Sequence, residues 1–269
     1  MGNYVATTKL QQEEMLAELG LTNLMELYAS VPQDLLVQKL NIPSELSQLE
    51  IEQKLTALSK ENTQFSAIYR GAGAYNHYIP PMVRRVSQKE AFLTSYTPYQ
   101  AELSQGVLQN IFEYQSIICE LTGMDVSNAS MYDVASALAE ACAMSYSKKR
   151  TKTLIADTAN PNYIQTVKTY AHALGMQVEL VASKDGRVDK EALTKALEDD
   201  SVASFALQQP NYFGIIEDAK DLGLLMSESK ANYIMCSNPL MLTVIKSPKE
   251  CGADIACGEA QPLGLALNF

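Results

Sequence analysis

The 269-residue sequence has no tryptophan, only two histidines and no long apolar run. A helix that crosses a bilayer needs roughly 18 or more consecutive apolar residues, so we expect no membrane span. The first ten residues also lack a basic stretch followed by an apolar one, which is the pattern of a secretory signal. We therefore expect a soluble protein of the cytoplasm.

Positive charge is scarce. The 21 basic residues are outnumbered by 31 acidic ones, which gives a formal net charge of −10. Proteins that bind nucleic acid gather lysine and arginine against the phosphates, so this composition argues against such a partner. The charge is more simply explained by solubility.

The cysteines are odd in number and scattered through apolar segments. They are Cys119, Cys142, Cys236, Cys251 and Cys257. This distribution predicts reduced, buried thiols. The last two lie too far apart for the short spacings of a zinc site, and no histidine is near them, so we expect no metal.

The N-terminal part of the sequence reads as helical. Ser47 and Glu50 have the spacing of a capping box, and Ile51, Leu55 and Leu58 then fall on one helical face. The stretch 70–100 is rich in glycine, tyrosine and proline and follows no regular period. Long loops of this kind usually belong to a binding site or an interface.

Further along, helices are predicted over 104–121 and 132–147, and short apolar strands then alternate with amphipathic helices. The expected strands are 153–157, 176–182, 202–207, 233–236 and 253–257, and the helices between them are 162–174, 189–197 and 217–229. This alternation indicates an α/β fold with a mostly parallel sheet. The apolar last residues, LGLALNF, lead us to expect that the chain is a fragment or is completed by a partner.

Three segments resemble a known family. They are YRGAGAYNHYIPP (residues 69–81), the block SYTPYQAELSQGVLQNIFEYQSIICELTGMDVSNASMYDVASALAEA (95–141) and GADIACGEAQPLGLALNF (252–269). Together they are similar to subunit 1 of the two-subunit glycine decarboxylase, the P-protein of the glycine cleavage system. The resemblance implies the aminotransferase-like fold of PLP-dependent transferases (fold type I). Residues 1–90 would form an N-terminal helical segment with an interface loop, and 91–269 a large α/β domain. The family continues into a smaller C-terminal domain.

The resemblance implies chemistry that needs pyridoxal 5'-phosphate (PLP), which accepts the electrons left when glycine loses carbon dioxide. A lysine shortly after a late strand of this fold holds PLP as a Schiff base. Between Gly252 and Phe269 there is no lysine, and Gln261 and Pro262 stand where one is expected. We therefore expect a lysine-bearing second subunit to bind most of the cofactor, and no catalytic residue in this chain.

The turn that matches the cofactor-phosphate site of the family is Asn128–Ser136. Phosphates bind at helix N-termini, where free backbone N–H groups and the helix dipole meet the anion. Ser130 could donate its hydroxyl, but Met131 and Tyr132 are bulky where catalytic relatives tend to have small residues. We therefore expect a degenerate phosphate turn. The simpler interpretation of Ser130 is an ordinary helix N-cap.

The resemblance also implies an active site at a subunit interface that borrows residues from the neighbouring chain. The polar-tipped side chains expected to line it are Tyr75, Asn76, His77, Tyr96, Thr97 and Tyr99. Tyrosine and histidine can stack on a pyridine ring or orient a carboxylate. Interface packing is the alternative role for the tyrosines, and a structural hydrogen bond for His77. His172 and Glu259 are interpreted as a structural residue and a solvated loop residue.

By this resemblance the chain is subunit 1 of glycine dehydrogenase (aminomethyl-transferring). It would join subunit 2 in an α2β2 heterotetramer, decarboxylate glycine and pass the aminomethyl group to lipoylated H-protein. A truncated, non-catalytic paralogue that only binds the partner is the alternative, which Asn238 and Ala260 favour slightly. A self-sufficient enzyme would have to use another lysine such as Lys246, which precedes the last strand instead of following it.

Overall fold

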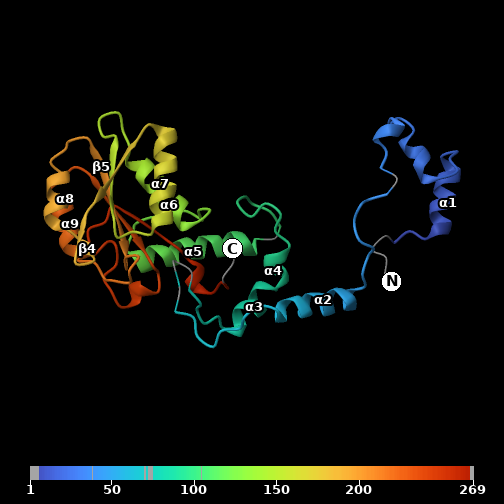
Figure 1. Ribbon diagram of the computed structural model, residues 1–269, viewed down its shortest axis with the longest axis horizontal. Helices are drawn as coiled ribbons and strands as arrows, with labels where there is room; N and C mark the ends of the chain where they lie inside the picture. The colour runs from blue at the N-terminus through green and yellow to red at the C-terminus, as the bar shows by residue number, and fades with distance from the viewer. Residues whose placement is uncertain (1–5, 38, 70, 72–74, 104, 267–269) are drawn as a thin grey trace. The chain divides into compact units, whose positions relative to one another are not determined.

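The computed structural model describes residues 6–37, 39–69, 71, 75–103 and 105–266. The chain divides into two compact units, Met1–Ile68 and Tyr69–Phe269. In the first unit the secondary structure is helical, as the sequence predicts (Figure 1). Its elements are α1 (Lys9–Glu18), α2 (Gln48–Lys60) and the short 3-10 helices η1 (Leu24–Tyr28) and η2 (Gln33–Leu35).

Capping boxes start both α-helices of the first unit. Thr8 caps α1, and Ser47 caps α2 as predicted, with the Ser47 hydroxyl accepting from the backbone N of Glu50. The unit has little core, because Leu16 is its one buried side chain among the described residues. The apolar stripe of α2, for example Leu55 at 59% exposure, covers nothing within the unit.

The second unit begins with helices that the sequence analysis missed. The stretch 70–100 contains α3 (Pro81–Ser87) and α4 (Glu90–Leu93), so the expectation of no regular element was wrong. Pro81 sits at the first position of α3, where its fixed φ suits a helix and its missing N–H costs nothing. These helices were missed because each is too short to show a helical period. The predicted helix that follows is α5 (Gly106–Thr122).

A five-stranded parallel sheet forms the centre of this unit, in the order β2-β1-β5-β6-β7. Its strands are β1 (Lys152–Ala156), β2 (Gln177–Val181), β5 (Val202–Gln209), β6 (Asn232–Ser237) and β7 (Ile255–Gly258). All four pairings are parallel. All five predicted strands are present. The chain also forms a small antiparallel hairpin, β3 (Ser183–Lys184) and β4 (Arg187–Val188), whose strands the sequence pattern did not predict.

Helices cover both faces of the sheet (Figure 1). On one face α6 (Val134–Ser145) and α7 (Pro161–Leu174) bury Leu138 and Val167 against Ile155 and Ile234. On the other face α8 (Lys190–Ala196) and α9 (Ala219–Ser227) pack on a cluster that contains the stacked rings of Phe205 and Tyr233. This two-sided burial explains why the strands read as nearly continuous apolar runs.

Two glycines allow the backbone to approach closely in this core. A Cβ on Gly223 of α9 would lie 1.8 Å from the Cys251 carbonyl oxygen. A Cβ on Gly258 of β7 would lie 2.2 Å from the carbonyl oxygen of Ser237 on β6. In the part of the chain that the structure describes, no helix is both long and apolar enough to span a membrane.

Candidate functional site

The carboxyl edge of the sheet is the place where open parallel α/β folds bind their ligands. The chain leaves this edge after each of the five strands: after β2 it enters the β3–β4 hairpin, and four further loops begin after β1, β5, β6 and β7. Helix α6 also starts at this edge, because the chain leaves its other end to enter β1 at the amino edge. The candidate site is therefore built from these four loops and the N-terminus of α6.

A carboxylate of the chain itself caps α6. Asp133 is the N-cap, and its Oδ1 accepts a 2.7 Å hydrogen bond from the backbone N of Ser136. The interpretation of Ser130 as the N-cap is therefore wrong, since Ser130 lies three residues earlier and is exposed. Tyr132, one of the bulky residues of this turn, is 96% exposed. A bound phosphate here would meet a negative charge where it needs free N–H groups.

The loop after β7 contains no amine. Glu259 Oε1 accepts from the backbone N of Gln261 at 3.1 Å, and Gln261 Nε2 donates to the carbonyl oxygen of Leu265 at 2.6 Å. Pro262 is buried in a single 3-10 turn, Gln261–Leu263. Lys246 precedes β7 and is exposed. The residues at the expected lysine position thus form a self-contained turn.

Phenols and carboxylates gather where α5, α6, α7 and β7 meet this edge. Burial raises the pKa of Tyr163, and the charges of the Cys236 thiol and the Glu259 and Asp133 carboxyl groups act in the same direction. Burial, and then Glu259, likewise raise the pKa of Tyr114. Both pKa values rise chiefly because the phenols lose contact with water, and the acidic groups nearby add to the effect.

One buried polar atom lacks a partner in the described structure, the hydroxyl oxygen of Ser237 at the end of β6. Its strand neighbour on β7 is Gly258, which has no side chain to offer. A single neutral hydroxyl does not make a phosphate cradle, and it cannot replace an imine-forming amine. The residues at this edge therefore do not fit PLP as the chain's own cofactor.

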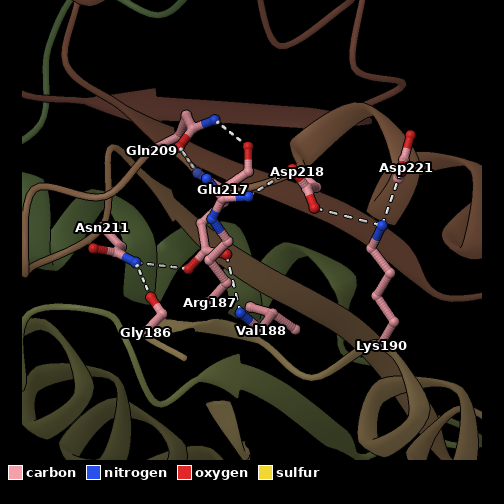
Figure 2. A network of polar contacts seen from close by, with 9 residues as sticks. All are labelled: Gly186, Arg187, Val188, Lys190, Gln209, Asn211, Glu217, Asp218 and Asp221. Carbon is pink, nitrogen blue, oxygen red and sulfur yellow. Dashed lines mark hydrogen bonds and ion pairs between the residues drawn. The ribbon is translucent and has the colours of Figure 1, made fainter. Parts of the chain in front are cut away.

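The polar groups of the same edge bind one another instead (Figure 2). Glu217 lies 4% exposed in the loop before α9 and accepts hydrogen bonds from Thr158, Asn211 and the backbone N of Val188. Sequence reasoning missed this residue, because the helix expected over 217–229 begins at Ala219. A glutamate between apolar Ile215-Ile216 and a helix is a weak signal, since most such residues are solvated.

The predicted lining residues fall in two separate segments of the second unit. Tyr75, Asn76 and His77 lie shortly before α3, and the Tyr75 ring lies against Gly71, so that a Cβ at position 71 would clash with it. His77 is half-buried, and Asn76 is exposed.

Tyr96, Thr97 and Tyr99 lie between α4 and α5. The Glu102 carboxylate accepts from the backbone N of Tyr96 and of Thr97, each at 3.1 Å, and from the Thr97 hydroxyl at 2.9 Å. These bonds, led by those of Thr97, lower the pKa of Glu102. Glu102 thus fixes the backbone at Tyr96 and Thr97. The rings of Tyr96 and Tyr99 are 93% and 75% exposed.

Whether the two segments line one site stays a prediction. His172, the second histidine, lies exposed in the last turn of α7. In the described part of the chain no group of three or more histidine, cysteine or carboxylate side chains could hold a metal ion. The cysteines are free thiols.

The sheet order, its flanking helices and the carboxyl-edge site define an aminotransferase-like α/β protein of fold type I. The solved alanine–glyoxylate aminotransferase from Nostoc sp. shares this fold. Its TM-score is 0.54 at 17% identity, over 77% of this chain and 54% of that one.

The chain belongs to the glycine cleavage system P-protein family, whose model matches residues 2–269. A solved glycine decarboxylase (P-protein) in inhibitor-bound form is 33% identical with a TM-score of 0.87, over 100% of this chain and 60% of that one. The resemblance stated from the sequence is confirmed.

Curated relatives carry the same family name. The "Probable glycine dehydrogenase (decarboxylating) subunit 1" of Carboxydothermus hydrogenoformans is 43% identical over 99% of this chain and 61% of the relative. The protein of that name from Desulfitobacterium hafniense is 45% identical over 99% and 60%. The chain thus spans about 60% of the length of the relatives it matches.

Proposed function

We propose that the chain acts as subunit 1 of a cytoplasmic glycine dehydrogenase (decarboxylating). It would assemble with a lysine-bearing second subunit as an α2β2 heterotetramer, and that subunit would bind PLP. The assembled enzyme would decarboxylate glycine and pass the aminomethyl group to the lipoyl group of H-protein. Sequence identity of 43–45% to proteins named subunit 1 supports this proposal.

The observation that carries it is the lack of an amine after β7. A fold type I enzyme that forms a Schiff base needs a lysine there, and this chain has none from Gly252 to Phe269. The carboxylate of Asp133 at the start of α6 adds an independent reason. Both features favour a partner that supplies the amine and the phosphate site.

In this assembly the segments 75–77 and 96–99 would reach the site of the second subunit. Their aromatic rings are exposed, which suits side chains that contact another chain. Glu102 holds the second segment in one conformation. His77 and Tyr96 would orient substrate groups by hydrogen bonds.

The test is co-expression with the second subunit, followed by an assay of labelled bicarbonate exchange into glycine with PLP and lipoylated H-protein. Exchange that needs both chains supports the proposal. Stable co-purification without exchange would favour a truncated, non-catalytic paralogue. A borohydride-reducible PLP adduct on this chain alone would contradict the assignment of the cofactor to the partner.

The lining residues are tested in the same complex. His77→Ala and Tyr96→Phe should lower bicarbonate exchange at least fivefold without dissociating the subunits, because the first removes the imidazole nitrogens and the second removes the phenolic hydroxyl. The matched controls are His172→Ala on α7 and Tyr78→Phe, which is 82% exposed. If bicarbonate exchange were unchanged in His77→Ala and Tyr96→Phe, the prediction that these two residues line the site would be wrong.

A further inference from the structure

Glu217 is a buried carboxylate that the proposed chemistry does not use. Its Oε1 accepts hydrogen bonds from Thr158 Oγ1 at 2.9 Å and from Asn211 Nδ2 at 2.8 Å, and its Oε2 accepts from the backbone N of Val188 at 3.0 Å. The side chain is 4% exposed. Such burial is costly for a carboxylate unless donors surround it, as they do here.

The three donors come from three different segments of the chain. Thr158 lies in the loop after β1, Val188 in β4 and Asn211 in the loop after β5. The backbone of Glu217 is held as well, because the Gln209 amide accepts from its N at 2.9 Å and donates to its O at 3.0 Å. Glu217 therefore joins three segments whose donors lie 59, 29 and 6 positions from it in sequence.

No basic side chain neutralises Glu217 among the described residues. Arg187 pairs with Asp218 at 3.3 Å, and Lys190 pairs with Asp218 at 3.6 Å and with Asp221 at 2.8 Å (Figure 2). The carboxylate thus depends on neutral donors alone. Three donors face two acceptor oxygens, so an amide at this position would turn one acceptor into a donor.

The contacts of Asn211 extend the network into the loop. Its Nδ2 also donates to the Gly186 carbonyl oxygen at 2.9 Å, and its Oδ1 accepts from the backbone N of Phe213 and of Ile215, each at 3.1 Å. The backbone N of Tyr212 donates to the Thr158 carbonyl oxygen at 2.9 Å. The loop 210–216 is therefore tied to the β1 loop and to the hairpin through Asn211 and Glu217.

We propose that Glu217 is a positioning residue, which locks the loops after β1 and β5 and the β3–β4 hairpin in one arrangement at the carboxyl edge of the sheet. In the assembled enzyme this lock fixes the face that the chain contributes to the decarboxylase; this second statement rests on the proposed function. Its removal opens the loops locally and leaves the sheet folded.

Hydrogen–deuterium exchange of the full chain tests the lock. In Glu217→Gln, amides of 183–189 and 209–218 should exchange at least tenfold faster, while β1 and β6 keep their protection. Thr158→Val, which removes one donor at equal volume, should show a smaller rise in the same peptides. Thr158→Ser and the exposed Asp221→Asn are the controls. Unchanged protection in both Glu217→Gln and Thr158→Val, or equal loss across the sheet, would overturn the lock.

Kinetics of the complex with the second subunit test the functional part. At a temperature where every variant is fully folded, Glu217→Gln should lower kcat for bicarbonate exchange at least tenfold, and Thr158→Ser should restore what Thr158→Val loses. If the variant kept the wild-type kcat and KM although its loop amides exchanged hydrogen faster, the positioning role would be overturned. Absence of bicarbonate exchange in the wild-type complex would instead overturn the proposed function. The hydrogen–deuterium exchange result on the isolated chain would still stand.

Discussion

The chain forms helices on both sides of Asp133, and the two parts differ in how many residues these helices bury. Among the described residues, Leu16 is the one buried side chain before position 134, whereas helices α6 to α9 and strands β1, β2, β4, β5 and β6 each bury at least one residue. Phe112 on α5 is 65% exposed, and Phe205 on β5 is 0% exposed. An amphipathic pattern thus predicts a helix without saying which surface it covers.

The physical consequence is that stability should reside in residues 134–266. Burial of apolar area is the main favourable term in folding, and helices that bury nothing are marginal in water. Within its own unit α2 leaves its apolar stripe exposed, whereas most apolar residues of α5 are half-buried.

The largest effect is expected from a pair of phenylalanines. Phe205→Ala removes a fully buried ring that stacks on Tyr233 at a centroid distance of 6.0 Å, and should lower the free energy of unfolding by about 3–5 kcal/mol. Phe112→Ala removes a mostly exposed ring and should change it by less than about 0.5 kcal/mol. Denaturant unfolding of the two variants measures both values. Equal losses would show that α5 has a core of its own.

The next effect comes from a close backbone contact. Gly223→Ala would place a Cβ 1.8 Å from the Cys251 carbonyl oxygen, and a backbone atom cannot rotate away. We expect a loss of about 3 kcal/mol, the upper end of the usual cost of overpacking. Leu224→Ala is the control, because the neighbouring side chain is 61% exposed. A small loss in Gly223→Ala, seen in thermal or denaturant unfolding, would contradict the packing of α9 against the loop before β7.

The sheet domain could be predicted from sequence because its central strands β1, β5 and β6 are buried on both sides. Apolar runs such as 153–157 and 202–207 then mark strands directly, and Gly175 marks the end of α7. The short α3 and α4 could not be predicted, since four to seven residues show too little of a helical period. The role of Glu217 could not be predicted from sequence, because it depends on Thr158 and Val188, which only the fold brings near it.

The candidate site was predicted in part. The missing amine after β7 is a property of the sequence and could be seen there, whereas the cap of α6 was assigned to the wrong residue. Ser130 and Asp133 are both good N-caps, and the choice between them depends on where the helix begins. The structure begins it at Val134, immediately after Asp133.

Removal of a helix cap should also affect the two parts differently, with a smaller change in the free energy of unfolding. Asp133→Ala leaves the Ser136 N–H without its acceptor and should cost about 1 kcal/mol in global unfolding, because α6 contributes Leu138 and Ala139 to the core. Ser47→Ala removes the cap of α2 and should reduce helical circular dichroism without moving the main unfolding transition. A shift of that transition in Ser47→Ala would mean that α2 unfolds together with the sheet.

Acid unfolding gives the finest comparison. Hydrogen bonds from Lys152, at 2.8 Å in the ion pair, and then from Ser201 hold the pKa of Asp199 below its usual 3.8. A carboxyl whose pKa is depressed in the folded state stabilises that state above its unfolded pKa, and this stabilisation is lost as the pH falls through the lower folded value.

Lys152→Met should therefore make the free energy of unfolding fall less steeply between pH 4 and lower values, measured by denaturant titration at each pH. The effect is small, because Asp199 is exposed and solvent screens the pair. The Ser47 bonds also depress the pKa of Glu50 in α2. Its protonation, or Glu50→Gln, should leave the acid dependence of the sheet domain unchanged, since no residue of α2 is buried. If Glu50→Gln flattened the same curve, the first part of the chain would have to fold together with the sheet.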